Sequence, residues 1–216
     1  MSPDLRAALT EHMTEARITE FYGASETSFI SLAGAGAPVA SVGMPYPGVQ
    51  IGIGPCLSQS PFETGEIWIK SPYLFDGYAY GKSAETKWHD NALTVGELGY
   101  FDGGGHLFLV GRKSRVITVA DQNVSLDAIE ATLAKLPGIS TCAVVARPDR
   151  MRGQVPVCII QSLEPELTQE EVARHCRAES GPHAIPRDVH FVSDMPVLSS
   201  GKPNLIELAR RFGSAK

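Results

Sequence analysis

A single lysine near the end of the chain is the residue best placed to do chemistry. Lys202 follows a Ser-Ser-Gly turn at residues 199–201, and a helical pattern, Leu205 to Phe212, begins directly behind it. The ammonium of a lysine on an exposed turn is a compact charge that can swing onto an anionic reacting centre. Taken alone, a Gly-Lys pair after serine is more typical of a solvated turn. The functional interpretation therefore depends on other segments.

Four such segments lie upstream of this loop, in a fixed order. Residues 22–26 read Tyr-Gly-Ala-Ser-Glu, residues 65–69 read Gly-Glu-Ile-Trp-Ile, residues 95–100 read Val-Gly-Glu-Leu-Gly-Tyr, and residues 111–117 read Gly-Arg-Lys-Ser-Arg-Val-Ile. They offer an aromatic ring, carboxylates, a hydroxyl and guanidinium groups. A carboxylate is a hard oxygen ligand that suits Mg²⁺, and the planar fork of an arginine suits two oxygens.

In this order and at this spacing, the five segments resemble the adenylate-forming superfamily. That family comprises acyl- and aryl-CoA synthetases, peptide-synthetase adenylation domains and beetle luciferases. The resemblance runs from about Asp4 to Arg211 and is greatest to acyl- and aryl-CoA synthetases. It implies a two-step reaction. A carboxylate attacks the α-phosphorus of ATP to give an acyl-adenylate and pyrophosphate, and a thiol of coenzyme A or of a carrier pantetheine then takes the acyl group.

The resemblance assigns roles to the first of these segments. Tyr22 would stack on the adenine of ATP or AMP, with packing of its ring in the core at a strand end as the alternative. Ser25, on the same turn as Gly23, would bond a phosphate oxygen. Glu26 would be a Mg²⁺ ligand and a catalytic residue, although outside this motif it would be an ordinary solvated acid.

Three later residues complete the expected site. Glu97 stands where the family carries an aspartate that accepts hydrogen bonds from the ribose hydroxyls. Arg112 matches an arginine that also contacts the ribose, with a surface ion pair to Glu97 or Asp102 as the alternative. Lys202 matches the lysine that bridges the substrate carboxylate and the ATP phosphate, and by this resemblance it would be a catalytic residue of the first step.

Four positions depart from the family pattern. Ser114 replaces a hinge aspartate or lysine, Thr118 replaces a common lysine, and Glu97 is one methylene longer than the usual aspartate. Asp121 replaces a glycine that lets a strand approach the pantetheine tunnel, and its charge would repel an incoming phosphopantetheine arm. An adenylate-forming amide synthetase is therefore an alternative, because an amine acceptor would tolerate Asp121.

The family's glycine- and threonine-rich phosphate loop does not occur in this sequence, and neither do the segments that build the acyl pocket. We therefore expect a truncated chain that corresponds to the last part of the large domain and the whole mobile domain. Such a chain would be inactive alone and would associate with a complementary N-terminal chain or with itself. A degenerate, non-catalytic module that binds a nucleotide or a partner is the other alternative.

The composition narrows the class of protein. The chain has 216 residues, of which 43% are hydrophobic and 20% are charged, as in ordinary globular proteins. Its net charge of −5 argues against a nucleic-acid binder. The four cysteines form no CxxC pair, so they predict neither a zinc site nor a disulfide framework. We therefore expect a cytoplasmic protein without a membrane span, and the family resemblance implies that it acts on a small carboxylic acid.

The elements that must position these residues fall into two halves on either side of a charged joint at Gly111–Arg115. We expect the end of a large AMP-binding domain over 1–111 and a mobile domain over 112–216. The fold class is a mixture of α/β and α+β. The first half should hold a helix over 4–16, a strand over 18–22 that leads into a turn at Gly23, and a small antiparallel β subdomain over 38–110, with Trp88 as an anchor of an irregular stretch.

The second half alternates strands and helices and is predicted to form a compact α+β domain. A capping serine and a capping box mark the starts of two helices. The expected elements are a strand at 116–119, a helix that Ser125 caps and Pro137-Gly138 stops, strands at 141–146 and 155–161, a helix from Thr168 to about Ala178, a strand at 189–192 and a helix at 205–212.

Overall fold

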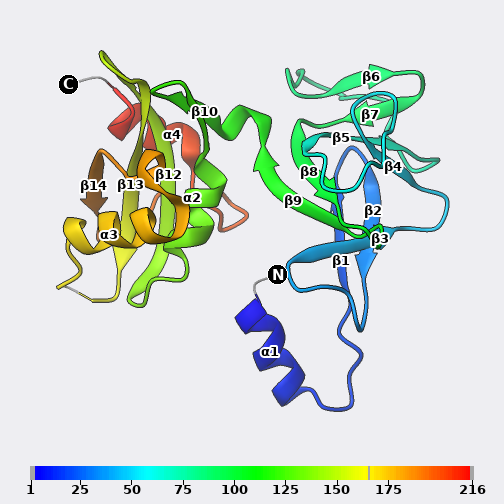
Figure 1. Ribbon diagram of the computed structural model, residues 1–216, viewed down its shortest axis with the longest axis horizontal. Helices are drawn as coiled ribbons and strands as arrows, with labels where there is room; N and C mark the ends of the chain where they lie inside the picture. The colour runs from blue at the N-terminus through cyan, green and yellow to red at the C-terminus, as the bar shows by residue number, and fades with distance from the viewer. Residues whose placement is uncertain (1–2, 165, 215–216) are drawn as a thin grey trace. The chain divides into compact units, whose positions relative to one another are not determined.

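The structure, a computed structural model, describes residues 3–164 and 166–214 of the chain. It divides into two compact units, Met1–Lys113 and Ser114–Lys216 (Figure 1). Each unit has its own core. The first unit is mainly antiparallel sheet and the second packs helices on a sheet, so the predicted mixture of α/β and α+β structure is confirmed. No helix in the described ranges has the length and apolar character needed to cross a membrane.

The first unit combines a helix with a nine-stranded antiparallel sheet in the order β1-β2-β3-β9-β8-β5-β7-β6, with β4 paired to β5. Its elements are α1 (Pro3–His12), β1 (Glu20–Ala24), β2 (Ser28–Ala33), β3 (Ser41–Pro45), β4 (Gln50–Ile53), β5 (Gly65–Lys70), β6 (Lys87–His89), β7 (Ala92–Thr94), β8 (Glu97–Phe101) and β9 (Leu107–Arg112). Strands β8 and β9 pair antiparallel within the predicted β subdomain, and residues 102–106 connect them.

Three local predictions in this unit are wrong. The helix expected over 4–16 ends at His12. The strand expected to stop before Gly23 continues to Ala24, because a bulge at Tyr22 and Gly23 keeps β1 paired with β2. A Cβ on Gly23 would lie 2.0 Å from the carbonyl oxygen of Ser28, so only glycine allows this approach. The stretch around Trp88 is not wholly irregular, because Lys87–His89 form β6, and Trp88, which is 49% exposed, stacks on Phe75 outside the core cluster.

The core of this unit lies on one face of the sheet, and the other face of its first strands remains open. Side chains alternate along a strand, so Tyr22 points into the core while Phe21 points outward. Register pairs Phe21 with Leu32, and Leu32 with Met44, on that outer face. The core cluster comprises Tyr22, Ile30, Val49, Ile51, Ile53, Ile67, Ile69, Phe101 and Leu107.

The second unit contains a five-stranded sheet in the order β11-β10-β13-β12, to which β14 adds in parallel beside β13. Its elements are β10 (Val116–Val119), β11 (Gln122–Ser125), α2 (Leu126–Leu133), β12 (Ile139–Asp149), β13 (Gly153–Ser162), α3 (Gln169–Ser180), β14 (Asp188–Phe191) and α4 (Leu205–Phe212), with single 3₁₀ turns at Lys113–Arg115 and Pro182–Ala184.

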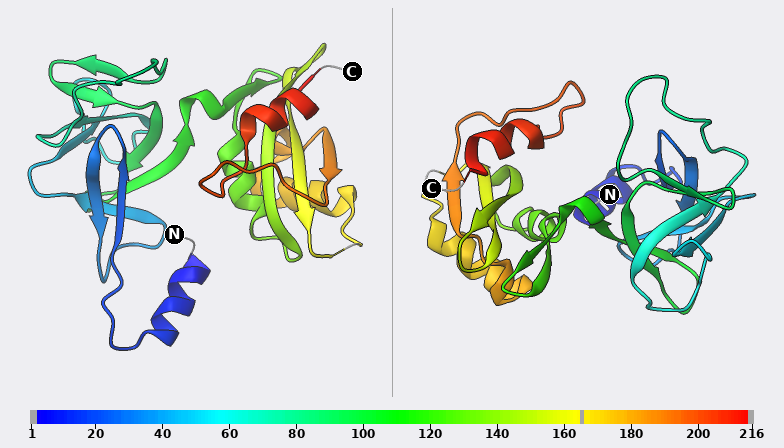
Figure 2. Two further views of the ribbon diagram at one scale, coloured as in Figure 1. Left: turned by 180° about the vertical axis from the view of Figure 1, so that it is seen from behind. Right: turned by 90° about the horizontal axis from the view of Figure 1, so that it is seen from above.

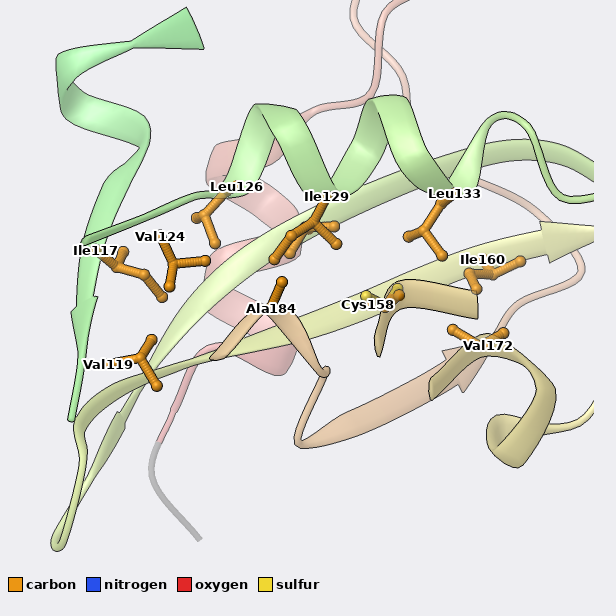
Figure 3. Close-up of a cluster of buried hydrophobic side chains, with 12 residues drawn as sticks. Ile117, Val119, Val124, Leu126, Ile129, Leu133, Cys158, Ile160, Val172 and Ala184 are labelled. Carbon is orange, nitrogen blue, oxygen red and sulfur yellow. The ribbon is translucent and has the colours of Figure 1, made fainter. Parts of the chain in front are cut away.

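Helices cover both faces of this sheet. Val144, Cys158 and Ile160 pack with α2 and α3 on one face (Figure 3). Val145 and Ile159 pack with Leu208 of α4 on the other face. The view from above in Figure 2 shows α4 and α3 on opposite sides of this sheet. A strand that is buried on both faces needs apolar residues at successive positions, which explains the continuous apolar runs of β12 and β13.

The predicted helix caps of this unit are confirmed. The Ser125 hydroxyl accepts a hydrogen bond from the backbone N–H of Ala128, and Thr168 and Glu171 form a complete capping box. The helix after Ser125 ends at Leu133, before the predicted stop. Strand β11 was not predicted, because it is short and polar and pairs with β10 across a tight two-residue turn.

Candidate functional site

Three residues of the expected nucleoside site meet in the first unit. Glu97 and Arg112 face each other in the β8–β9 register, and the Tyr22 hydroxyl on β1 donates a short hydrogen bond to Glu97 Oε2. Arg112 Nε lies 3.8 Å from Glu97 Oε1. The carboxylate of Glu97 is thus held between a phenol and a guanidinium, and the ion pair that the sequence offered as the alternative for Arg112 is present.

The ring of Tyr22 is part of the core. It is 9% exposed and packs in the cluster of the first unit. Core packing was the alternative to adenine stacking, and the structure contains that packing. The role of Tyr22 in stacking on an adenine stays a prediction, and the hydroxyl contact with Glu97 is a role that the sequence did not indicate.

The turn after β1 carries the other expected residues. Ser25 and Gly23 are exposed, and Glu26 is half-buried. Glu26 Oε1 accepts a hydrogen bond of 2.6 Å from the Tyr78 hydroxyl, and its backbone oxygen accepts one from the N–H of Phe75 at 2.9 Å. Tyr78 was missed, because it lies in a stretch without any periodic pattern. This loop fixes the Glu26 carboxylate.

The residues present fit a Mg²⁺ ion that is bound mainly through phosphates. Among the described residues, no three His, Cys, Asp or Glu side chains gather closely enough to hold a metal ion without a ligand's help. Mg²⁺ in nucleotide enzymes keeps several waters and takes only one or two protein carboxylates, with phosphate oxygens completing its shell. Glu26 alone could supply such a carboxylate, and this role stays a prediction.

Lys202 lies in the second unit, on an exposed hairpin-like loop. Val197 and Pro203 form a bridge, and Leu198 N–H donates to the carbonyl of Lys202 at 2.8 Å. Gly201 adopts φ +80, a region that favours glycine. Behind the loop, the Asn204 side chain caps α4. In the part of the chain that the structure describes, no carboxylate pairs with the ammonium, and the predicted exposed turn is confirmed.

The joint between the units is fixed on both sides. Lys113 donates its backbone N–H to Gly96 O at 2.8 Å and its ammonium lies 3.1 Å from Glu66 Oε2. Arg115 donates to Asp127 Oδ1 at 2.6 Å and forms a short ion pair with Glu130. Burial raises the pKa of Glu130, against the opposing charge of Arg115. The sequence did not reveal this clamp.

The three departures in the second unit all lie on its surface. Ser114 and Thr118 are exposed. Asp121 is also exposed and occupies the β10–β11 turn at φ 63, next to Ala120 at φ 47. Two successive positive φ angles are typical of the tight turns that join antiparallel strands. Asp121 is therefore a turn residue with its carboxylate in solvent.

Two protein-family models match this sequence. The model described as AMP-binding enzyme matches residues 1–79, and the model described as AMP-binding enzyme C-terminal domain matches residues 128–202. A 2-succinylbenzoate–CoA ligase of Lactococcus lactis subsp. lactis is 34% identical over 163 residues, which are 75% of this chain and 34% of that protein. The 4-coumarate–CoA ligase-like 4 of Oryza sativa subsp. japonica is 36% identical over 152 residues, which are 68% of this chain and 28% of that protein.

Two solved structures are also similar to this chain. A variant of an amide bond synthetase from Marinactinospora thermotolerans superimposes with a TM-score of 0.82 at 28% identity, covering 97% of this chain and 45% of that one. The o-succinylbenzoate CoA synthetase of Bacillus subtilis, in complex with its acyl-adenylate intermediate, gives a TM-score of 0.80 at 25% identity, covering 93% and 43%. The chain thus spans 28% to 45% of the length of these four proteins.

Proposed function

Because this chain belongs to the adenylate-forming family of AMP-binding enzymes, we propose that it supplies the nucleoside-binding residues and the catalytic lysine of an ATP-dependent carboxylic acid ligase. Residues 1–111 would be the end of the AMP-binding domain and residues 112–216 the mobile C-terminal domain. The contact of Tyr22, Glu97 and Arg112 carries the proposal, since Tyr22 and Glu97 lie 75 positions apart in the sequence and the fold brings them together.

The chemistry of the Glu97 cluster suits a ribose. A carboxylate accepts hydrogen bonds on both oxygens; Tyr22 donates to one oxygen of Glu97, and Arg112 lies beside the other. A carboxylate in this position would also accept hydrogen bonds from ribose hydroxyls. Arg112, whose side chain is 64% exposed, can donate to the same ribose without leaving Glu97. Tyr22 and Arg112 therefore hold the orientation of the carboxylate before the nucleotide arrives.

In the first step a carboxylate oxygen of the acid attacks the α-phosphorus of ATP, and the bond to the bridging oxygen breaks, which releases pyrophosphate. Lys202 stabilises the negative charge that develops between the two anions. Glu26 would hold a Mg²⁺ ion, which neutralises phosphate charge, and Ser25 would bond a phosphate oxygen. In the second step the sulfur of coenzyme A or a carrier pantetheine attacks the acyl carbon, AMP leaves with the bonding pair, and the thiol proton passes to solvent.

We further propose that the chain works with a partner. Its first unit leaves an apolar surface uncovered. A complementary chain or a second copy would cover this surface, and light scattering would detect the second copy. The exposed apolar side chains of this surface are Phe21, Phe29, Leu32 and Met44.

The four cysteines are free, which fits the reducing cytoplasm.

ATP–pyrophosphate exchange with a panel of small carboxylic acids tests the proposal. The assay is run on the chain alone and on the chain mixed with the product of the reading frame directly upstream. Exchange that appears only on mixing supports a ligase completed by a second chain. Absence of both exchange and ATP binding in either sample would instead identify a degenerate module without catalytic function.

An amide synthetase is the second candidate, and two observations favour it. The amide bond synthetase of Marinactinospora thermotolerans is a structural neighbour at 28% identity, and Asp121 places a carboxylate on the β10–β11 turn. An enzyme of this kind uses an amine in the second step. Product analysis with equal concentrations of coenzyme A and simple amines separates the two, since a thioester and an amide differ in mass and in stability to hydroxylamine.

A further inference from the structure

The hydroxyl of Tyr78 has no part in the proposed reaction so far, although it contacts a residue that does. It donates a hydrogen bond of 2.6 Å to Oε1 of Glu26, which lies 52 positions away in the sequence. Among the described residues, no donor and no cation contacts the other oxygen, Oε2. The carboxylate of Glu26 therefore has one oxygen occupied by the protein and one oxygen left for a ligand.

A third side chain fixes the direction of this hydrogen bond. The oxygens of the Tyr78 and Thr86 hydroxyls lie 2.8 Å apart. A phenol carries a single proton, so while Tyr78 donates to Glu26 the Thr86 hydroxyl must donate to Tyr78. A hydroxyl that accepts a hydrogen bond is polarised and becomes a stronger donor. Thr86 thus strengthens the hold of Tyr78 on Glu26.

The two partners sit on segments that are tied together. The Glu26 turn is closed by the fully buried Thr27, whose N–H donates to Ala24 O at 3.1 Å and whose hydroxyl accepts from Ala24 N–H at 3.1 Å. From the other segment, Phe75 N–H donates to Glu26 O at 2.9 Å. The ring of Phe75 packs edge-on against Tyr78, with centroids 4.9 Å apart. Backbone and side-chain contacts therefore keep the phenol beside Oε1.

Divalent cations differ in how they use a carboxylate. Ca²⁺ takes about six to eight oxygen ligands and often binds both oxygens of one carboxylate, whereas Mg²⁺ requires a near-octahedral shell and keeps several waters. With Oε1 occupied, Glu26 can offer only Oε2 to a cation. We propose that Tyr78 is a positioning residue that restricts Glu26 to a single bond with the cation and thereby makes the site select Mg²⁺ over Ca²⁺. The inference rests on the proposed function, in which Glu26 holds the cation.

Calorimetric titration of the full chain with MgATP and, separately, with CaATP tests this role, with each cation in excess so that all ATP is complexed. The chain should bind MgATP more tightly. Tyr78→Phe keeps the ring and removes the hydroxyl. It should lower the ratio of the CaATP Kd to the MgATP Kd about tenfold, since a group that hydrogen-bonds a metal ligand typically contributes about tenfold to a hundredfold in affinity. A merely structural role would weaken both complexes alike and leave the ratio unchanged.

Three further variants sharpen the test. Tyr80→Phe is the matched control, because Tyr80 lies in the same loop and is 95% exposed, and it should leave the ratio unchanged. Thr86→Val removes the donor to the phenol and should lower the ratio less than Tyr78→Phe does. In a Glu26→Gln background, Tyr78→Phe should have no further effect, because both residues act through the same oxygen.

An unchanged ratio in Tyr78→Phe, an equal fall in Tyr80→Phe, or failure of the full chain to bind MgATP would overturn the inference. The inference and the proposed function fail separately, because exchange is measured in its own assay. Pyrophosphate exchange with an unchanged ratio removes the role of Tyr78 and leaves the ligase. A ratio that falls only in the Tyr78 variant, without exchange in any mixture, supports the role of Tyr78 and removes the ligase.

Discussion

In the first unit three of the predicted site residues contact one another, whereas in the second no carboxylate of the described residues pairs with the predicted catalytic lysine. Glu97 is bound by Tyr22 and Arg112, while Lys202 stands on an exposed loop. A nucleoside needs donors and acceptors that are already in place, because ordering them on binding costs free energy. A charge that must reach a reacting centre needs the opposite property. The difference therefore matches a fixed binding surface and a charge that is delivered to it.

The two units also differ in how completely their apolar cores are covered, and here the second unit is the more complete. The sheet of the second unit is covered by helices on both faces, and its apolar interior is closed. The first unit leaves Phe21, Phe29 and Leu32 exposed on the outer face of its first strands. The unit with the fixed site thus has the incomplete core, and the unit with the free lysine has the complete one. The closed core of the second unit and the fixed site of the first can each be tested by substitution.

The largest expected effect is a difference in thiol reactivity. Burial raises the pKa of Cys142 to about 12 and that of Cys176 to about 11. Because the thiolate is the reactive form, Cys142 and Cys176 should react at least about a hundredfold more slowly than the exposed Cys56 at pH 8. Intact-mass spectrometry after iodoacetamide treatment should show one adduct on the folded chain and four in denaturant.

The same pKa shifts predict how stability depends on pH. A thiol whose folded pKa is raised favours the folded state below its unfolded pKa, and this contribution is lost as pH rises through the folded value. Stability of the second unit should therefore fall between about pH 8.5, the unfolded value, and the folded pKa of Cys176, about 11.

In the iodoacetamide experiment, rapid labelling of all four thiols without denaturant would show that the core of the second unit is not closed.

The next effect is on the stability of the closed core. Ile129 is fully buried between α2 and the sheet. Ile129→Ala should lower the free energy of unfolding of the second unit by about 2–5 kcal/mol, because it removes packed methylene groups and leaves a cavity. Urea unfolding measures the loss. Ile206→Ala on α4, where the side chain is 86% exposed, should change stability by less than about 0.5 kcal/mol. Similar losses would contradict the packing described for α2.

The third effect separates the two half-reactions. In the completed enzyme, Lys202→Ala should slow adenylate formation by about a hundredfold or more, because a charge stabilising the transition state is removed. Thiol transfer from preformed acyl-adenylate should be nearly unchanged, and single-turnover assays measure each step. Lys135→Ala, which removes an exposed lysine of the same unit, is the control. Equal loss of both steps would exclude the assigned role.

The smallest effect concerns the fixed site. Glu97→Gln keeps the shape of the side chain but removes its charge. AMP should bind about tenfold more weakly by calorimetry, because a hydrogen bond to a charged acceptor becomes one to a neutral amide. Glu63→Gln, at an exposed position of the same unit, should leave the affinity unchanged. Unchanged affinity in Glu97→Gln as well would remove this residue from the nucleoside site.

Much of the second unit could be predicted from local signals. Short sequence motifs predict the caps at Ser125 and Thr168 and the helix Leu205–Phe212, and the structure contains each of them. Strand β11 could not be predicted, because its pairing depends on the turn at Ala120 and Asp121 and not on hydrophobic alternation. Local capping chemistry is readable from sequence, whereas a strand stabilised only by its partner is not.

The site was less accessible to sequence reasoning than the fold. The motif identified Glu97 and Arg112, but their contact with the Tyr22 hydroxyl depends on three strands that pair far apart in the chain. Tyr78 gave no signal, because a tyrosine in an irregular loop has no pattern to distinguish it. Arg115 was visible only as part of a charged joint, and its contacts with Asp127 and Glu130 appear only when β10 and α2 are placed.

The joint has a consequence for how the chain can reorient. Lys113 is bonded within the first unit and Arg115 within the second, so Ser114 is the residue between two anchored neighbours. Peptide planarity leaves that residue two soft dihedral angles, and sterics restrict these to a few basins. Any rotation through Ser114 would then be a jump between a small number of discrete orientations, and Ser114→Pro, which fixes φ, should leave few of them.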